Sequence, residues 1–152
     1  LKQYVSTLHK TNIKLKQLIK NLFFSTSNKK ILEITNDVKD LLLSSKISNG
    51  LLNLSVLHTS CSLMVQENAD NTVLRDIRRF LDNIAPEEFN YFHNTEGPDD
   101  MPAHLKSLLT QTNLTLSIKE KKLILGTWQG IFLLEHRDAN KQRNVLFHLI
   151  GD

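Results

Sequence analysis

The chain has 152 residues, enough for one domain with a hydrophobic core and too few for two domains of ordinary size. It is 40% hydrophobic and 23% charged, which is typical of a globular protein, and no apolar run approaches the roughly 20 residues of a membrane-spanning helix. The single cysteine, Cys61, excludes a disulfide within the chain, fits a reducing compartment and is expected to face the core. We therefore expect a cytoplasmic protein with no membrane partner.

The net charge of +3 is distributed unevenly along the chain. Residues 1–57 carry nine lysines and three acids (+6), residues 58–104 carry three arginines and nine acids (−6), and residues 105–152 carry seven basic and four acidic residues (+3). The lysines of the first third are scattered, and no stacking aromatics alternate with them. This pattern argues against nucleic-acid binding, and we expect no nucleic-acid partner. The acidic middle segment holds three of the six histidines, which is typical of a metal or proton-transfer site.

The first half of the chain predicts strands around one helix. Residues 1–30 fit neither helical nor strand periodicity well, and we expect one or two edge strands and a loop there. Thr35 is predicted to cap a helix that stops at Gly50. Apolar and polar residues alternate over 52–57, which predicts a strand, and residues 63–65 predict another.

The second half predicts two helices and four strands. Asp70 is a suitable cap for a helix over residues 72–83, which Pro86 ends. A Gly/Pro-rich loop follows, and then a short helix over Pro102–Leu109. Strands are predicted near the end of the chain over residues 114–118, 123–125, 128–135 and 145–150. Because helical crossovers are too few for a doubly wound sheet, we expect one small α+β domain with a largely antiparallel β-sheet packed with a few helices.

Three histidines are the main candidates for metal ligands. His58 follows a predicted strand, and His93 and His104 flank the Gly/Pro-rich loop, where functional side chains are often held. They share no familiar zinc-binding spacing, so each alone could simply satisfy local backbone groups. Together with the carboxylates of the loop they favour a divalent metal ion, zinc or magnesium, as cofactor. Those carboxylates, which could instead form a solvated acidic surface, are Glu96, Asp99 and Asp100.

Other residues could bind phosphate or shape a pocket. Ser60 and neighbouring hydroxyl side chains lie at a strand end and can hold a phosphate, although such residues are also common in turns. Arg137 and Arg143 flank a loop near the end of the sequence and could clamp a phosphate. Trp128 lies between two apolar runs, where it could form a pocket wall, a subunit interface or part of a bulged core strand.

Four runs of residues resemble the YjbQ family: HTSCSL at 58–63, ENAD at 67–70, DDMPAHLKS at 99–107 and LILGTWQGI at 123–131. The resemblance extends in order and with compatible spacing over residues 31–151, whereas residues 1–30 match poorly. We therefore expect residues 1–152 to form a single YjbQ-like domain, with a divergent N-terminal part and a family core.

The resemblance also implies an assembly and a set of site residues. It implies a homotrimer with sites near the subunit boundaries, and it implies that His58, His93 and His104 converge on a metal. Catalytic roles are implied for Glu67, Asp70 and Arg143. Substrate-binding roles are expected for Ser60, Asp99, Lys106, Trp128 and Gln129.

Members of the YjbQ family are described as secondary thiamine-phosphate synthases. That activity joins hydroxymethylpyrimidine diphosphate to thiazole phosphate and releases pyrophosphate. The resemblance implies a metal-assisted enzyme that acts on a small phosphorylated metabolite, in which cationic groups neutralise the leaving diphosphate. The alternative is a non-catalytic trimeric protein that binds a metal or ligand at the same histidine and carboxylate cluster.

Overall fold

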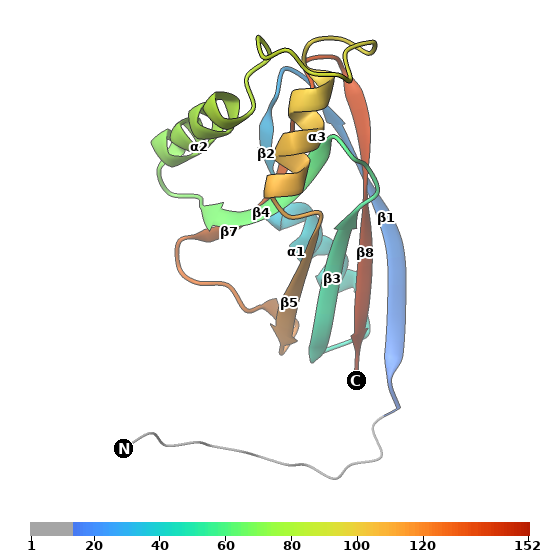
Figure 1. The fold of residues 1–152 in the computed structure, drawn as a ribbon. Coiled ribbons are helices and arrows are strands. Elements are labelled where there is room, and N and C mark those ends of the chain that lie inside the picture. The colour runs from blue at the N-terminus through green and yellow to red at the C-terminus, as the bar shows by residue number, and fades with distance from the viewer. Residues whose placement is uncertain (1–13) are drawn as a thin grey trace, which may run out of the picture.

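The structure is a computed structural model that describes residues 14–152. In this part of the chain, two antiparallel sheets and three helices make up the fold (Figure 1). The larger sheet has the strand order β1 (Lys16–Thr26), β8 (Lys141–Gly151), β3 (Gly50–Val56), β5 (Asn113–Lys119), β6 (Lys122–Leu123). The smaller sheet has the order β2 (Ile31–Glu33), β7 (Gln129–Glu135), β4 (Cys61–Glu67). The helices are α1 (Thr35–Ser44), α2 (Asn71–Ile84) and α3 (Asp100–Leu109). The predicted α+β class with antiparallel pairing is confirmed, with the strands divided between two sheets.

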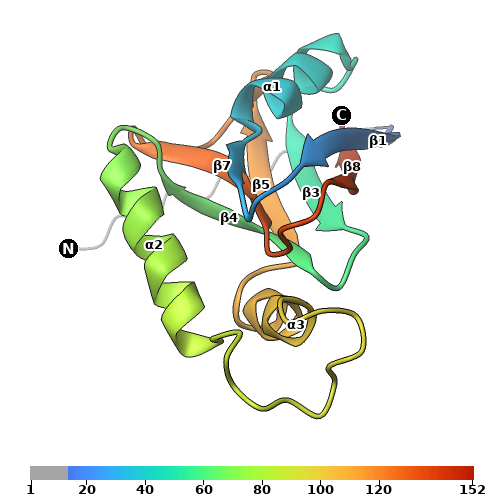
Figure 2. The ribbon, with the colours of Figure 1, turned by 90° about the horizontal axis from the view of Figure 1, so that it is seen from above.

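The hydrophobic core lies between the two sheets, with α1 at one of its borders (Figure 2). Leu52 and Leu54 alternate with more exposed residues along β3 and are 0% exposed, as the sequence pattern predicts. Val38 and Leu42 bring one face of α1 into the same core. Cys61 at the start of β4 is also buried there, and burial raises the pKa of its thiol to about 12. The expectation that Cys61 faces the core is confirmed.

β1 is an edge strand, as expected for this part of the sequence. It pairs with β8 along its whole length. The part of the expectation that concerns residues 1–13 lies outside the described residues. The face of the large sheet that points away from the core, which we call the outer face, carries exposed apolar side chains: Ile19 is 55%, Phe23 61% and Leu51 50% exposed. Leu146 and Ile150 of β8 lie between them on this face and are partly buried.

α1 begins at Thr35, but the Thr35 side chain does not cap it. The hydroxyl donates to Glu33 Oε1 at 2.8 Å and accepts from the Ile131 N–H at 2.9 Å. It therefore joins β2 to β7, so the predicted cap is wrong. The predicted stop is also wrong, because the Ser45 N–H closes the last turn on the Leu42 carbonyl and Gly50 begins β3.

α2 and α3 lie closer to their predictions. Asp70 Oδ1 accepts from the Thr72 N–H at 2.7 Å, so the predicted cap of α2 is confirmed. α3 begins at Asp100, earlier than predicted, and Pro102 stays in its first turn, where the missing N–H removes no helical hydrogen bond. None of the helices within residues 14–152 is both long and apolar enough to cross a membrane.

Candidate metal centre

Two histidines and one aspartate converge beside the N-terminal end of α3. His93, Asp100 and His104 each offer one ligand atom, and the three atoms lie within 4.8 Å of one another. Asp100 Oδ2 is 2.8 Å from His93 Nε2 and 3.5 Å from His104 Nε2. Two imidazoles and one carboxylate form a donor set that zinc and other divalent transition metals accept, with positions left for water or substrate.

The local sequence explains this convergence. Asp100 and His104 are one turn apart on α3, so their side chains share a face of the helix. His93 approaches from the loop between α2 and α3, and its ring centroid is 5.7 Å from that of His104. The loop turns at Gly97, whose φ of 109° lies in the left-handed region that favours glycine. The early start of α3 therefore places both of its ligands against the loop histidine.

Arg137 holds the carboxylates of this loop. Its Nη1 donates to Asp100 Oδ1, its Nε donates to Asp99 Oδ2 at 3.0 Å, and its Nη2 donates to the Glu96 carbonyl at 2.8 Å. Asp100 is only 3% exposed, so Arg137 compensates a buried charge and leaves Oδ2 facing the histidines. The Asp138 N–H also donates to Asp99, at 2.9 Å. Burial opposes ionisation of Asp99, but these hydrogen bonds outweigh burial and lower its pKa.

A backbone carbonyl orients His104. The Nδ1 atom of His104 lies 3.1 Å from the Thr59 carbonyl oxygen, and a carbonyl can only accept a hydrogen bond. Nδ1 therefore carries a proton, and Nε2 faces the cluster. Support of this kind behind a ligand fixes the tautomer and ring orientation at protein metal sites.

His58 lies apart from the cluster that His93 and His104 form. Its Nε2 accepts from the Asn144 N–H at 2.9 Å, so this lone pair is already used. Burial and the nearby Arg143 guanidinium lower the pKa of His58. Of the three histidines proposed as metal ligands, the structure brings together two and adds Asp100 as the third donor.

The cationic candidates Arg143 and Lys106 are buried and paired. Arg143 donates to Glu135 from Nη2 at 2.5 Å and from Nε at 2.6 Å, and Nη2 also lies 3.1 Å from Ser60 Oγ. Lys106 is 1% exposed and donates to Asp82 at 2.5 Å. Sequence reasoning missed Glu135. The available signal was a carboxylate at the end of an apolar strand, shortly before an arginine.

Comparison with known proteins identifies the family. The profile of the family described as UPF0047 protein YjbQ-like matches residues 20–152. The chain belongs to the YjbQ family. This YjbQ-family chain is 42% identical over 132 residues to a UPF0047 protein of Synechocystis, a match that spans 86% of the chain and 90% of that relative. It is 42% identical over 120 residues to the UPF0047 protein YjbQ of Escherichia coli, spanning 79% of the chain and 85% of that relative.

Solved structures share the same fold. A hypothetical protein from Thermus thermophilus is 38% identical, covers 84% of the chain and 97% of its own, and superposes with a TM-score of 0.74. A YjbQ/UPF0047-family protein from Clostridium acetobutylicum is 35% identical, covers 86% and 98%, and has a TM-score of 0.79. The resemblance to the YjbQ family inferred from the four sequence runs is confirmed.

Four of the expected site residues lie at the other end of β4 in this YjbQ-family chain. Cys61 pairs with Glu135 beside the histidines, whereas Glu67 pairs with Gln129 at the far end, about 20 Å along the strand. Trp128 lies next to Gln129 and is 64% exposed. Asp70, just beyond Glu67, caps α2. Within one chain, these residues do not join the cluster that includes His93 and His104.

The remaining histidines differ in their surroundings. His136 is 0% exposed, its Nε2 lies 2.8 Å from Ser62 Oγ, and burial is the largest of the causes that lower its pKa to about 3. His148 hydrogen-bonds Gln17 at the surface, and His9 lies outside the described residues. In the described part of the chain neither His136 nor His148 belongs to the candidate metal cluster.

Proposed function

We propose that this YjbQ-family protein is a metal-assisted enzyme that acts on a small phosphorylated metabolite, with thiamine-phosphate synthesis as the reaction to test first. The observation that carries the proposal is the arrangement of His93, Asp100 and His104. Their three ligand atoms lie within 4.8 Å of one another. Arg137 donates to Asp100 Oδ1, and the Thr59 carbonyl accepts a hydrogen bond from His104 Nδ1. Zinc or magnesium is the proposed cofactor, and zinc suits the two imidazoles better.

A bound divalent ion would supply Lewis-acid neutralisation of phosphate oxygens on a leaving diphosphate. The protein keeps the site reachable, because the side chains of His93 and His104 are 43% and 34% exposed. The ion pair with Arg137 orients the Asp100 carboxylate. Asp99 keeps Arg137 in place through a second ion pair, so we propose a positioning role for Asp99.

A second copy of the chain could bring further expected site residues to the histidine and aspartate cluster. Glu67, Trp128 and Gln129 lie too far from the histidines to act with them in the same chain. We propose the homotrimer implied by the family resemblance, in which these residues of one subunit complete the site of another. The outer face, with exposed Ile19 and Phe23, supports assembly because contiguous exposed apolar residues usually mark interaction surfaces.

The test combines metal binding and turnover. Wild type and His104→Ala are stripped of metal, titrated with Zn²⁺ and Mg²⁺ by calorimetry, and assayed for pyrophosphate release from hydroxymethylpyrimidine diphosphate and thiazole phosphate. We expect His104→Ala to lose both metal binding and turnover, while the control Asp40→Ala, on the exposed side of α1, keeps both. Equal turnover in wild type and His104→Ala would refute the proposal.

The paired cations favour one alternative function. Because Arg143 and Lys106 are already bound to Glu135 and Asp82, neither is free to neutralise a substrate in this conformation. A non-catalytic trimeric protein that holds a metal or ligand at the same cluster needs no such free cation. Metal binding that raises the melting temperature, without product formation from any phosphorylated substrate tested, would favour this alternative.

Composition supports a cytoplasmic location and argues against a nucleic-acid partner. The single buried cysteine suits a cytoplasmic location. The scattered lysines of the N-terminal third argue against a nucleic-acid partner. Retention on a nucleic-acid column at low salt, lost steeply as salt is added, would contradict the absence of a nucleic-acid partner.

A further inference from the structure

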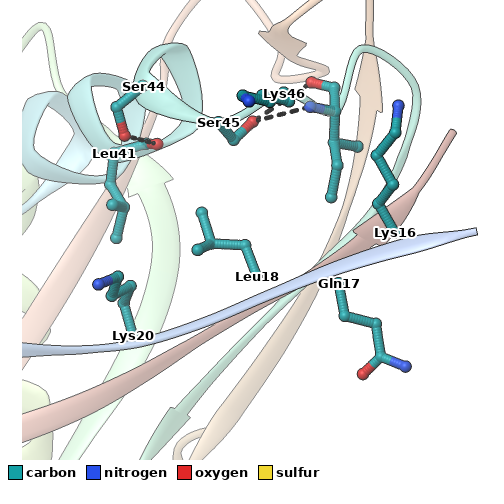
Figure 3. A pocket seen from close by; sticks show the side chains of 9 residues that line it. Lys16, Gln17, Leu18, Lys20, Leu41, Ser44, Ser45 and Lys46 are labelled. Atoms are coloured by element: carbon teal, nitrogen blue, oxygen red, sulfur yellow. Dashed lines mark hydrogen bonds between the residues drawn. The ribbon is translucent and has the colours of Figure 1, made fainter.

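A pocket of about 380 Å³ lies between α1 and the edge strand β1, at the end of the large sheet opposite α3 (Figure 1). Its apolar floor is formed by Leu18 of β1, Leu41 of α1 and Ile47. Figure 3 shows Leu18 and Leu41 extending into the same gap from opposite sides, while Gln17 points away from it. The pocket therefore opens onto the border of the hydrophobic core.

Three lysines surround this apolar floor. Lys16 and Lys20 flank Leu18 on the same face of β1, as the alternation of a strand requires, and Lys46 follows the end of α1 (Figure 3). No carboxylate lines the pocket. Within residues 14–152 none of the three lysines takes part in an ion pair. The Asp152 carboxylate lies near enough to interact with Lys16, but it is already held by hydrogen bonds from the backbone and side chain of residues 48–49.

Several carbonyl groups at the C-terminal end of α1 already accept hydrogen bonds from donors other than these three lysines. Cations commonly complement the C-terminal end of a helix by approaching its last carbonyl groups. Here the Leu41 carbonyl accepts from Ser44 Oγ at 2.7 Å, and the Leu42 carbonyl accepts from the Ser45 N–H at 3.0 Å. The Ser45 carbonyl accepts from Lys121 Nζ at 3.0 Å. In the described part of the chain the ammonium groups of Lys16, Lys20 and Lys46 make no hydrogen bond or ion pair, and so they can contact a ligand.

We propose that this pocket binds a small amphipathic anion, a carboxylate on a hydrocarbon body. The ammonium groups of Lys16, Lys20 and Lys46 around the pocket would attract the carboxylate, and the hydrocarbon would cover Leu18 and Leu41. The pocket volume is within the range of about 300–1,000 Å³ that small-molecule sites occupy. The site is independent of His93, Asp100 and His104, so it stands whether or not the proposed metal chemistry does.

The test uses octanoate as the probe and two double variants that change net charge equally. Titration of ¹⁵N-labelled protein should give saturable amide shifts in residues 16–20 and 41–47. Lys16→Gln/Lys20→Gln should weaken octanoate binding by about tenfold, since two of the three attracting charges are lost. Lys30→Gln/Lys119→Gln, whose lysines lie outside the pocket, should bind octanoate as wild type does.

Two further arms decide what the pocket recognises. Octan-1-ol has the same hydrocarbon body without the charge, and we expect it to bind at least tenfold more weakly than octanoate. Equal affinity for the alcohol would show an apolar patch with no anion selectivity and would overturn the proposal. Equal octanoate binding by the two double variants, or the absence of saturable shifts, would overturn it as well.

Discussion

The buried ion pair between Glu135 and Arg143 gives the most direct test of the energetics of this fold. Replacing Arg143 by methionine keeps a side chain of similar length and removes the charge. Glu135, which is 0% exposed, then keeps only the Thr26 hydroxyl, at 2.5 Å, and the Arg137 N–H, at 2.9 Å, as donors. An uncompensated buried charge typically costs about 3–5 kcal/mol, so Arg143→Met should lower the free energy of unfolding by that amount at pH 7.

The pH dependence of this loss distinguishes an electrostatic cause from lost packing. In the native protein burial tends to raise the pKa of Glu135, but hydrogen bonds from Arg143, Thr26 and the Arg137 N–H outweigh it and hold the pKa below its ordinary value of 4.5. The stabilisation is therefore present above pH 4.5 and lost as the pH falls through the folded pKa. Without Arg143, burial raises the pKa of Glu135, so protonation relieves the penalty as the pH falls.

The assay is urea unfolding followed by circular dichroism at pH 7 and near pH 4.5. We expect the stability difference between wild type and Arg143→Met to be large at pH 7 and clearly smaller at the lower pH. The double variant Arg143→Met/Glu135→Gln keeps acceptor atoms without a charge and should recover most of the loss. A difference that is equal at both pH values, or a double variant as unstable as the single one, would refute the reasoning.

Three other predictions follow from single contacts. Burial holds the pKa of His136 at about 3, so neutral His136 makes its full contribution to stability above pH 6.5. Between pH 6.5 and the folded pKa this contribution falls by up to about 1.4 kcal/mol per pH unit. Urea titrations at several pH values should show that His136→Gln removes this pH dependence of the free energy of unfolding. Asp70→Ala should cost about 1 kcal/mol in thermal unfolding, and a cost no greater than that of the control Asp76→Ala would contradict the capping role. A Cβ on Gly97, where φ is 109°, would lie 3.3 Å from Asp99 Oδ1. Gly97→Ala should therefore destabilise the protein by about 1 kcal/mol and weaken zinc binding. Unchanged zinc affinity would show that the geometry of this loop does not limit the site.

The fold was predictable where one short segment contains the whole signal. Alternation over residues 52–57 and the Asp70 cap identified β3 and the start of α2 because both depend on neighbours in sequence. Thr35 was misread because its hydroxyl bonds to Ile131, nearly a hundred residues away. Periodicity indicates which face of a strand is buried, but the division of the strands into two sheets depends on long-range pairing that it does not record.

The candidate site was predictable in part for the same reason. His93 and His104 flank one loop, so their proximity follows from a short segment of chain. Asp100 could not be separated from Asp99 by sequence, because its role depends on the turn at which α3 begins. The position of His58 depends on Asn144 of β8, a contact formed only when the large sheet assembles.

The two proposed ligands on α3 have a consequence for how this protein family could diversify. Asp100 and His104 are fixed by the helix, by Arg137 and by the Thr59 carbonyl, so their geometry does not depend on residues 85–92. That stretch leads directly to His93 and presents Phe89 and Phe92 to solvent at 65% and 109% exposure. A change in the length of this stretch would move His93, whereas substitutions of Phe89 and Phe92 would alter the surface next to His93 and leave the three proposed ligands in place. Substitution of these two phenylalanines is thus a route by which the surroundings of the proposed centre can change without rebuilding it.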